Sequence, residues 1–268
     1  MAEVTPSSMQ RKIVALKALT AASAFLRKKF RTVEHAEEKA DGTLVSEADY
    51  GSERIIMSAL RRAFPDDAIL SEESGETRGS SGYRWILDPL DGTHNFLAGI
   101  PLFGILLALE RAGEVTLSFC VFPVLGEVFT AEKGKGAFLS GKRIRVSRTT
   151  SLKGGIFLAD GNSQFEFDSI LGDIEPLHAR GCRFRYLGEG PFGMTRVALG
   201  SALGATLRGK AWDIAAPALL VEEAGGKVTD LHGKPWRLEP HPLLASNGLV
   251  HDTVLALLTS SVSLQRKR

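Results

Sequence analysis

The spacing of apolar residues in the first half of the chain predicts two helices followed by strands. Apolar positions recur at helical spacing over residues 10–38, with at most one break, and again over residues 44–64, where Pro65 ends the pattern because proline cannot continue a helix. Short apolar runs with glycine-containing turns follow. They predict strands, with two or three antiparallel strands in residues 126–147.

The second half of the chain repeats this mixture. Strands are predicted at residues 154–160, 182–188, 205–209 and 227–230, and helices near residues 164–174, at 190–202, from 213 to about 224, and at 251–262. Helices and strands mixed throughout predict an α+β fold of layered sheets and helices. A boundary near residues 148–153 divides the chain into an N-terminal α+β subdomain, residues 1–150, and a C-terminal α/β subdomain, residues 151–268.

Composition and charge limit the possible partners. The 268 residues are 44% hydrophobic and 24% charged, which favours a folded globular protein over a disordered one. Lys and Arg number 33 against 31 acids, so charge gives no reason to expect nucleic acid or a membrane as partner. No apolar run approaches the ~20 residues of a membrane-spanning helix. Residues 11–30 are basic and lack acids, as in some targeting peptides, but a first helix with a solvated basic face is favoured.

The two cysteines, Cys120 and Cys182, form neither a disulfide framework nor a zinc-ligand spacing. This usage favours a reducing compartment, so we expect a cytoplasmic protein.

Acids interrupt apolar surroundings at three places. Glu72 and Glu73 follow one predicted strand, Asp88 and Asp91 follow another, and Asp213 stands between Trp212 and a predicted helix. Carboxylates placed directly after buried strands lie close together and lose water, which costs several kcal/mol each unless something neutralises them. Mg²⁺ prefers such carboxylate and carbonyl oxygens.

Each acid also has an ordinary explanation. Asp213 alone would be a helix cap, Glu72 and Glu73 a solvated pair, and the Asp-Gly-Thr triplet a turn.

The cluster at residues 88–93 is more specific evidence for a metal site. Pro89 holds Asp88 extended, so that Asp88 and Asp91 can flank a metal site with the Leu90 carbonyl between them.

Gly92 and Thr93 follow this cluster at a predicted turn into a helix, where free backbone amides can bind phosphate. Adjacent metal and anion sites are what hydrolysis of a phosphate ester requires.

The chain resembles the inositol monophosphatase family of magnesium-dependent, lithium-sensitive phosphatases. DPLDGTHNF at residues 88–96 and WDIAAPALLVEEAGG at residues 212–226 match its two signatures, and LVSEAD, SEES, GKGAFLSGKRIRVS and LLASNG are similar to further family segments. The similarity extends from Ile13 to Leu258. It implies a layered α-β-α-β-α sandwich of the inositol monophosphatase and fructose-1,6-bisphosphatase type, usually a homodimer.

The resemblance also implies roles for individual residues. Two or three Mg²⁺ would be held by side chains and one backbone carbonyl, those of Glu72, Asp88, Leu90, Asp91 and Asp213. Asp91, Gly92 and Thr93 would bind the phosphate. Glu72 and Thr93 would orient the attacking water, and Asp49 would support Thr93. The family uses direct attack by water without a phosphoenzyme.

The chain departs from the family pattern where the substrate's alcohol would bind. Gly188, Glu189 and Gly190 stand in place of the family's cyclitol-contacting loop, Thr43 replaces an acid, and Arg208 or Thr206 lies nearest the position of another substrate-binding acid. Arg208 facing the pocket would suit a second anionic group; a surface arginine at a turn is the alternative. His94 and Glu189 either line the pocket or face solvent.

The sequence therefore predicts a phosphomonoesterase acting on a small polyol or sugar phosphate, with inositol-1-phosphate as the default. Histidinol phosphate, fructose-1,6-bisphosphate and 3'-phosphoadenosine 5'-phosphate stay open as substrates. A haloacid-dehalogenase type of enzyme is disfavoured because its nucleophilic Asp lies two residues before a second Asp, whereas Asp88 and Asp91 are three apart. A non-catalytic ligand-binding relative is disfavoured because every metal position keeps its acid.

Overall fold

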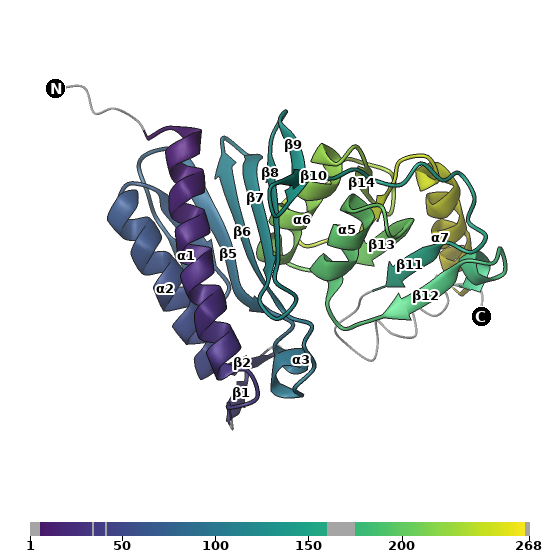
Figure 1. Ribbon diagram of the computed structural model, residues 1–268. Helices are drawn as coiled ribbons and strands as arrows, with labels where there is room; N and C mark the ends of the chain where they lie inside the picture. Colours follow the sequence, from purple (N-terminus) through teal and green to yellow (C-terminus); the bar gives the residue numbers. More distant parts are fainter. Residues whose placement is uncertain (1–5, 34, 41, 160–174, 266–268) are drawn as a thin grey trace.

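Five layers of helix and sheet make up the computed structural model, which describes residues 6–33, 35–40, 42–159 and 175–265. Helices α1 (Ser8–Lys29) and α2 (Glu47–Ala63) cover one face of a large sheet (Figure 1). Helices α5 (Gly190–Ala198) and α6 (Ala211–Glu223) lie between this sheet and a smaller one. Helix α7 (His251–Gln265) covers the far face of the smaller sheet. The expected α-β-α-β-α layering is confirmed.

The large sheet has eight strands in the order β10-β9-β8-β7-β6-β5-β3-β4. Its neighbours are antiparallel except β3 and β5, which run parallel. The bounds are β3 Ala68–Ser71, β4 Gly75–Thr77, β5 Tyr83–Asp91, β6 Gly104–Arg111, β7 Glu114–Phe122, β8 Glu127–Glu132, β9 Gly136–Leu139 and β10 Lys142–Arg143. The strands expected in residues 126–147 are therefore confirmed as β8, β9 and β10.

The small sheet has five strands in the order β12-β11-β13-β15-β14. Strand β11 runs parallel to both of its neighbours, and β15 runs antiparallel to both of its own. The bounds are β11 Ile156–Ala159, β12 Arg183–Tyr186, β13 Gly204–Leu207, β14 Lys227–Asp230 and β15 Leu243–Ser246. Sequence reasoning did not predict β15, because a four-residue apolar run beside prolines is too short to show a period.

The first two expected helices differ most from the observed ones, whereas α5, α6 and α7 differ from their expected bounds by at most four residues. The helix expected over residues 10–38 ends at Lys29, because Phe30 leaves the helical conformation, and Ala36–Glu38 forms strand β1 instead. The helix expected over residues 44–64 begins only at Glu47, since Leu44–Ser46 is strand β2, which pairs with β1. The Ser46 side chain caps the start of α2, and apolar spacing does not record such a cap. The helix expected near residues 164–174 lies outside the described residues.

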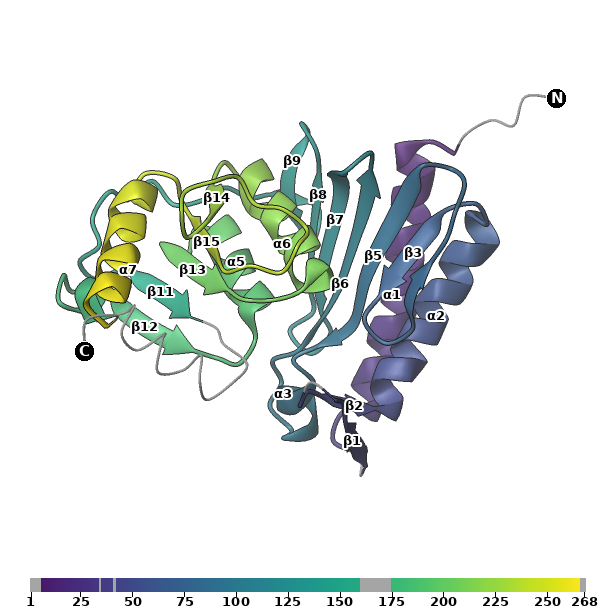
Figure 2. The same cartoon turned by 180° about the vertical axis from the view of Figure 1, so that it is seen from behind.

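Strand β5 runs between the hydrophobic cores on the two faces of the large sheet and ends at the predicted site residues Asp88 and Asp91. Trp85 and Leu87 face the core beneath α1 and α2, whereas Ile86 faces the core beneath α5 and α6. A strand covered on both faces carries a continuous apolar run, and here that run leads directly into Asp88. Figure 2 shows β5 ending beside helix α3 (Thr93–Leu97) and the β1–β2 hairpin. Among the described helices none is long and apolar enough to cross a membrane.

Candidate active site

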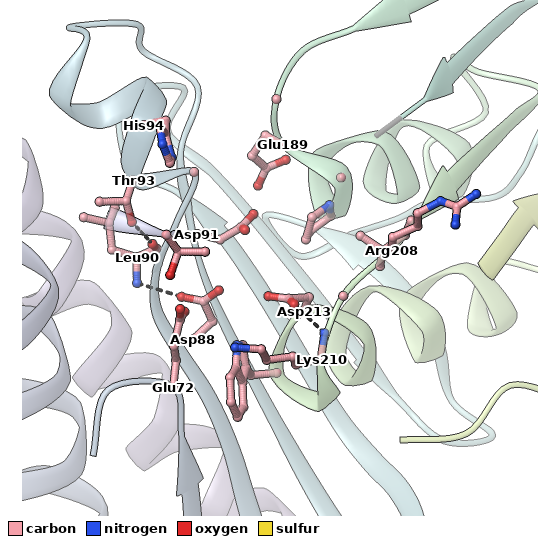
Figure 3. A pocket seen from close by; sticks show the side chains of 18 of the residues that line it. Glu72, Asp88, Leu90, Asp91, Thr93, His94, Glu189, Arg208, Lys210 and Asp213 are labelled. Carbon is pink, nitrogen blue, oxygen red and sulfur yellow. Dashed lines mark hydrogen bonds between the residues drawn. The ribbon is translucent and has the colours of Figure 1, made fainter. Parts of the chain in front are cut away.

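A bulge at the end of β5 presents two of the acids. The register between β5 and β6 shifts between Asp88 and Asp91, on either side of Pro89. The Ser52 hydroxyl on α2 donates a hydrogen bond of 2.7 Å to the Pro89 carbonyl, and the Leu90 amide donates one of 3.0 Å to the Asp88 carboxylate. The bulge is thus held from both sides, and it turns both carboxylates into one cavity (Figure 3).

Asp213 reaches the same cavity from the first turn of α6. Its carboxylate accepts a hydrogen bond of 2.6 Å from the Lys210 amide, which fixes the start of the helix. A side chain at Gly209 would come within 2.5 Å of the Asp213 carboxylate, so glycine is required for this close approach. Asp88, Asp91 and Asp213 each offer an oxygen, and these oxygens all lie within 4.8 Å of one another.

The grouped acids suppress one another's ionisation. Burial, followed by the charges of Glu72 and Asp213, raises the pKa of Asp88 well above its ordinary value. Burial also raises the pKa of Asp213, to about 7. Burial and the nearby Glu189 carboxylate raise the pKa of Asp91 in the same way. A bound cation stabilises the ionised form of carboxyl groups that are buried close to one another.

A divalent cation fits this donor set. One buried carboxylate oxygen of Asp91 and one of Glu189 have no hydrogen-bond partner. Such unsatisfied oxygens cost free energy unless a proton or a metal ion satisfies them. Oxygen-only donors, with no histidine or thiolate among them, favour Mg²⁺ over zinc.

Glu72 lines the same cavity from the residue after β3, but the group of three oxygens does not include it. The Lys39 ammonium, just after β1, donates to the Glu72 carboxylate at 2.9 Å and to the Glu73 carboxylate at 2.7 Å. Glu73 is therefore not a solvated acid: burial raises its pKa to about 7. Sequence reasoning missed Lys39, because its contact with Glu72 and Glu73 spans 33 and 34 positions of the chain and has no local signal.

Gly92 and Thr93 stand at the start of α3, where the phosphate is expected. Gly92 has φ +78°, and a side chain there would meet the Leu102 carbonyl and the Glu189 side chain at 3.1 and 3.2 Å. The Thr93 hydroxyl lies 3.0 Å from the Asp49 carboxylate and 3.0 Å from the Leu90 carbonyl. Both neighbours accept the single hydroxyl proton, so the lone pairs of the Thr93 oxygen are available to accept a hydrogen bond from a water molecule.

The cavity has a volume of about 560 Å³, and Gly188, Glu189, Gly190 and Arg208 line its opposite wall. His94 lines it from α3, beside Thr93. Glu189 is only 4% exposed, and it caps α5 by accepting from the Phe192 amide. Its carboxylate points toward Asp91, whereas the Arg208 side chain extends away from the acids (Figure 3).

Sequence reasoning missed several cavity residues. They come from the hairpin, the start of α6 and the loop before β15, and they include Leu44, Lys210, Trp212 and His241. Trp212 is part of the second signature, which is a local signal for its position. His241 has none, because only the packing of its loop brings it to the cavity.

Comparison with known proteins agrees with this geometry. The model of the inositol monophosphatase family matches residues 9–263. A fructose-1,6-bisphosphatase/inositol-1-monophosphatase of Thermotoga maritima is 38% identical over 232 residues, covering 86% of this chain and 88% of the relative. An inositol-1-monophosphatase of Mesorhizobium japonicum is 35% identical over 236 residues, covering 84% of this chain and 86% of the relative.

The solved structure of an inositol monophosphatase of Thermotoga maritima superimposes with a TM-score of 0.87 at 35% identity, covering 94% of this chain and 98% of that one. Sequence and structure therefore agree over nearly the whole chain. The chain belongs to the inositol monophosphatase family, whose members are phosphatases that hydrolyse phosphomonoesters.

Proposed function

We propose that this enzyme uses Mg²⁺ to hydrolyse the phosphate ester of a small polyol or sugar, with inositol-1-phosphate as the default substrate. The observation that carries the proposal is the convergence of Asp88, Asp91 and Asp213 beside the start of α3. These acids come from two chain segments more than a hundred residues apart, and they meet in a cavity large enough for a small phosphorylated metabolite.

Metal binding would use four of the acids that line the cavity. Two or three Mg²⁺ would be held by the side chains of Glu72, Asp88, Asp91 and Asp213 and by the carbonyl of Leu90. When bound, Mg²⁺ supplies charge that stabilises the phosphoryl oxygens and makes water a better nucleophile. Lys39 would have to share or release the Glu72 carboxylate, because one carboxylate oxygen already accepts from it.

The chain's own residues would orient the reactants. Gly92 and Thr93 would hold the phosphate at the start of α3. The Thr93 hydroxyl, donating to Asp49, would accept a hydrogen bond from the attacking water, and Glu72 would accept a second hydrogen bond from the same water. Both residues therefore act on the geometry of attack, and no covalent phosphoenzyme is needed.

The alcohol would lie between α3 and the loop of residues 188–190. Glu189 would accept hydrogen bonds from its hydroxyl groups. Arg208 lines the cavity away from the acids, where it would meet a second anionic group. This observation keeps a bisphosphate such as fructose-1,6-bisphosphate as a second candidate beside inositol-1-phosphate. Histidinol phosphate and 3'-phosphoadenosine 5'-phosphate belong in the same test.

The test is phosphate release from a panel of esters. The panel contains inositol-1-phosphate, fructose-1,6-bisphosphate, histidinol phosphate, 3'-phosphoadenosine 5'-phosphate and glycerol 2-phosphate. We expect turnover of at least one polyol or sugar phosphate that requires Mg²⁺ and that a chelator abolishes reversibly. Absence of Mg²⁺-dependent release from every ester would refute the proposal. A homodimer in the cytoplasm stays a prediction.

A further inference from the structure

One buried side chain joins the two walls of the cavity. Asn95 lies on α3, is 8% exposed and is not part of the cavity lining. Its side-chain amide donates to the Leu102 carbonyl at 2.9 Å and to the Leu187 carbonyl at 3.0 Å, with the Gly188 carbonyl at 3.4 Å. Asn95 therefore hydrogen-bonds to the backbone of Leu187 and Gly188, which follow it in the sequence by 92 and 93 positions.

The chemistry of this contact demands an amide. A primary amide carries two N–H donors on one nitrogen, which suits two carbonyl oxygens that can only accept. An ionised aspartate of nearly the same shape would face those carbonyls with no proton to donate. Leu187 and Gly188 stand between the end of β12 at Tyr186 and the start of α5 at Gly190, so neither lies within a helix or strand.

The two walls also approach each other closely. A side chain at Gly92 would meet the Glu189 side chain at 3.2 Å, and one at Gly188 would meet the Asn95 amide at 3.7 Å. The start of α3 and the proposed alcohol-binding loop therefore approach so closely that a side chain at Gly92 would fit only if a neighbouring group shifted. The separation between these walls decides which leaving group fits beside a bound phosphate.

We propose that Asn95 is a positioning residue that selects the substrate's alcohol by holding the loop of residues 188–190 at a set distance from the start of α3. This inference rests on the proposed function, because it concerns the leaving group of that reaction. Asn95 acts through backbone carbonyls and touches neither the phosphate nor the metal ligands. Substitution of Asn95 should therefore lower kcat/KM for substrates whose leaving group reaches the loop, and spare substrates whose leaving group does not reach it.

The experiment compares Asn95→Ala with the wild-type enzyme on two substrates, the best cyclic polyol or sugar phosphate of the panel and glycerol 2-phosphate. Asn95→Ser, which keeps one donor, provides a milder variant if Asn95→Ala does not fold. Asn247→Ala is the matched control: Asn247 is 3% exposed and its amide also donates to a backbone carbonyl, but its acceptor Thr149 lies outside the cavity lining, whereas Gly188 belongs to it.

We expect Asn95→Ala to lower kcat/KM for the larger substrate at least tenfold, mainly through KM, and for glycerol 2-phosphate less than threefold. Asn95→Ser should fall between, and Mg²⁺ affinity by calorimetry should change less than twofold in each. Asn247→Ala should lower the melting temperature without changing the ratio of the two kcat/KM values. Equal losses on both substrates, or a loss of Mg²⁺ affinity, would overturn the inference. A wild-type enzyme inactive on every ester would instead overturn the proposed function and remove this inference with it.

Discussion

The Thr93 hydroxyl donates to the Asp49 carboxylate at 3.0 Å, across 44 positions of the chain. Asp49 is 1% exposed, and it also accepts from the Ser46 amide and hydroxyl at 2.7 Å each, which caps α2. Burial raises the pKa of Asp49 although these hydrogen bonds act in the opposite direction. The first turn of α2 thus orients the hydroxyl that stands beside the proposed phosphate site.

Thr93→Ala is expected to lower kcat by about a hundredfold while KM changes less than threefold, because the hydroxyl would act on the attacking water rather than on substrate binding. Steady-state kinetics on the best substrate of the panel check this. Thr93→Ser is the control, since it keeps the hydroxyl and should retain most activity. A change confined to KM would contradict the proposed role.

Asp88→Asn and Asp213→Asn are expected to lower turnover by at least about a thousandfold, because each would remove a metal ligand. Without Mg²⁺ both variants should melt at or above the wild-type temperature, since the substitution removes a buried charge from a repelling group. Calorimetry with and without Mg²⁺ measures both effects.

Asp252→Asn is the control for these variants, because Asp252 is exposed on α7 and does not line the cavity. It should change neither turnover nor Mg²⁺ affinity. Near-normal activity in Asp88→Asn or Asp213→Asn would disprove the ligand assignment.

Mg²⁺ affinity is expected to rise with pH. The pKa of Asp213 is raised to about 7, so below that pH its carboxyl holds a proton that the metal must displace. A titration by calorimetry at pH 6 and pH 8 should show affinity higher by about tenfold or more at pH 8. Affinity that does not change over this range would contradict the raised pKa of Asp213.

One buried histidine is expected to destabilise the fold in acid, in opposition to the buried carboxyl groups whose pKa values are raised. His251 is fully buried, with its ring nitrogens 2.8 Å from the Ser246 hydroxyl and 2.9 Å from the Thr229 hydroxyl. Burial, followed by the charge of Lys227, lowers its pKa to about 4 from the usual 6.5. Below pH 6.5 the unfolded chain takes up a proton that the folded chain does not take up until about pH 4, so the contribution of His251 to stability is constant above pH 6.5 and falls by about 3 kcal/mol by pH 4.

Denaturant unfolding across this range tests the contribution of His251. The stability of His251→Gln relative to the wild type should rise between pH 6.5 and 4, whereas that of the exposed His232→Gln should not change with pH. An unchanged dependence in His251→Gln would assign the acid sensitivity to other groups.

Arg208→Ala is expected to lower kcat/KM for fructose-1,6-bisphosphate by about tenfold and to spare glycerol 2-phosphate, because a guanidinium contacts a second anionic group that only the first substrate carries. Parallel kinetics on both esters check this. Equal effects on the two substrates would remove Arg208 from substrate selection.

Much of the fold could be predicted because apolar periodicity records which face of an element is buried. The run through Trp85 and Leu87 identified β5, and glycine turns identified the hairpins of β8 to β10. The ends of α1 and α2 were wrong, because Phe30 and the Ser46 cap depend on backbone conformation and polar hydrogen bonds, which periodicity does not record. The domain boundary and the residue roles stay predictions.

By itself the sequence determined the family, through two signatures in a fixed order, and it indicated the candidate residues for the chemistry, which are acids directly after apolar strands. Only the tertiary structure decided which side chains meet. Lys39 on Glu72, Glu189 beside Asp91, and Asn95 on Leu187 join segments that share no local pattern. The physical reason is that periodicity encodes the direction in which a residue faces, whereas the partner it meets there depends on how whole layers pack.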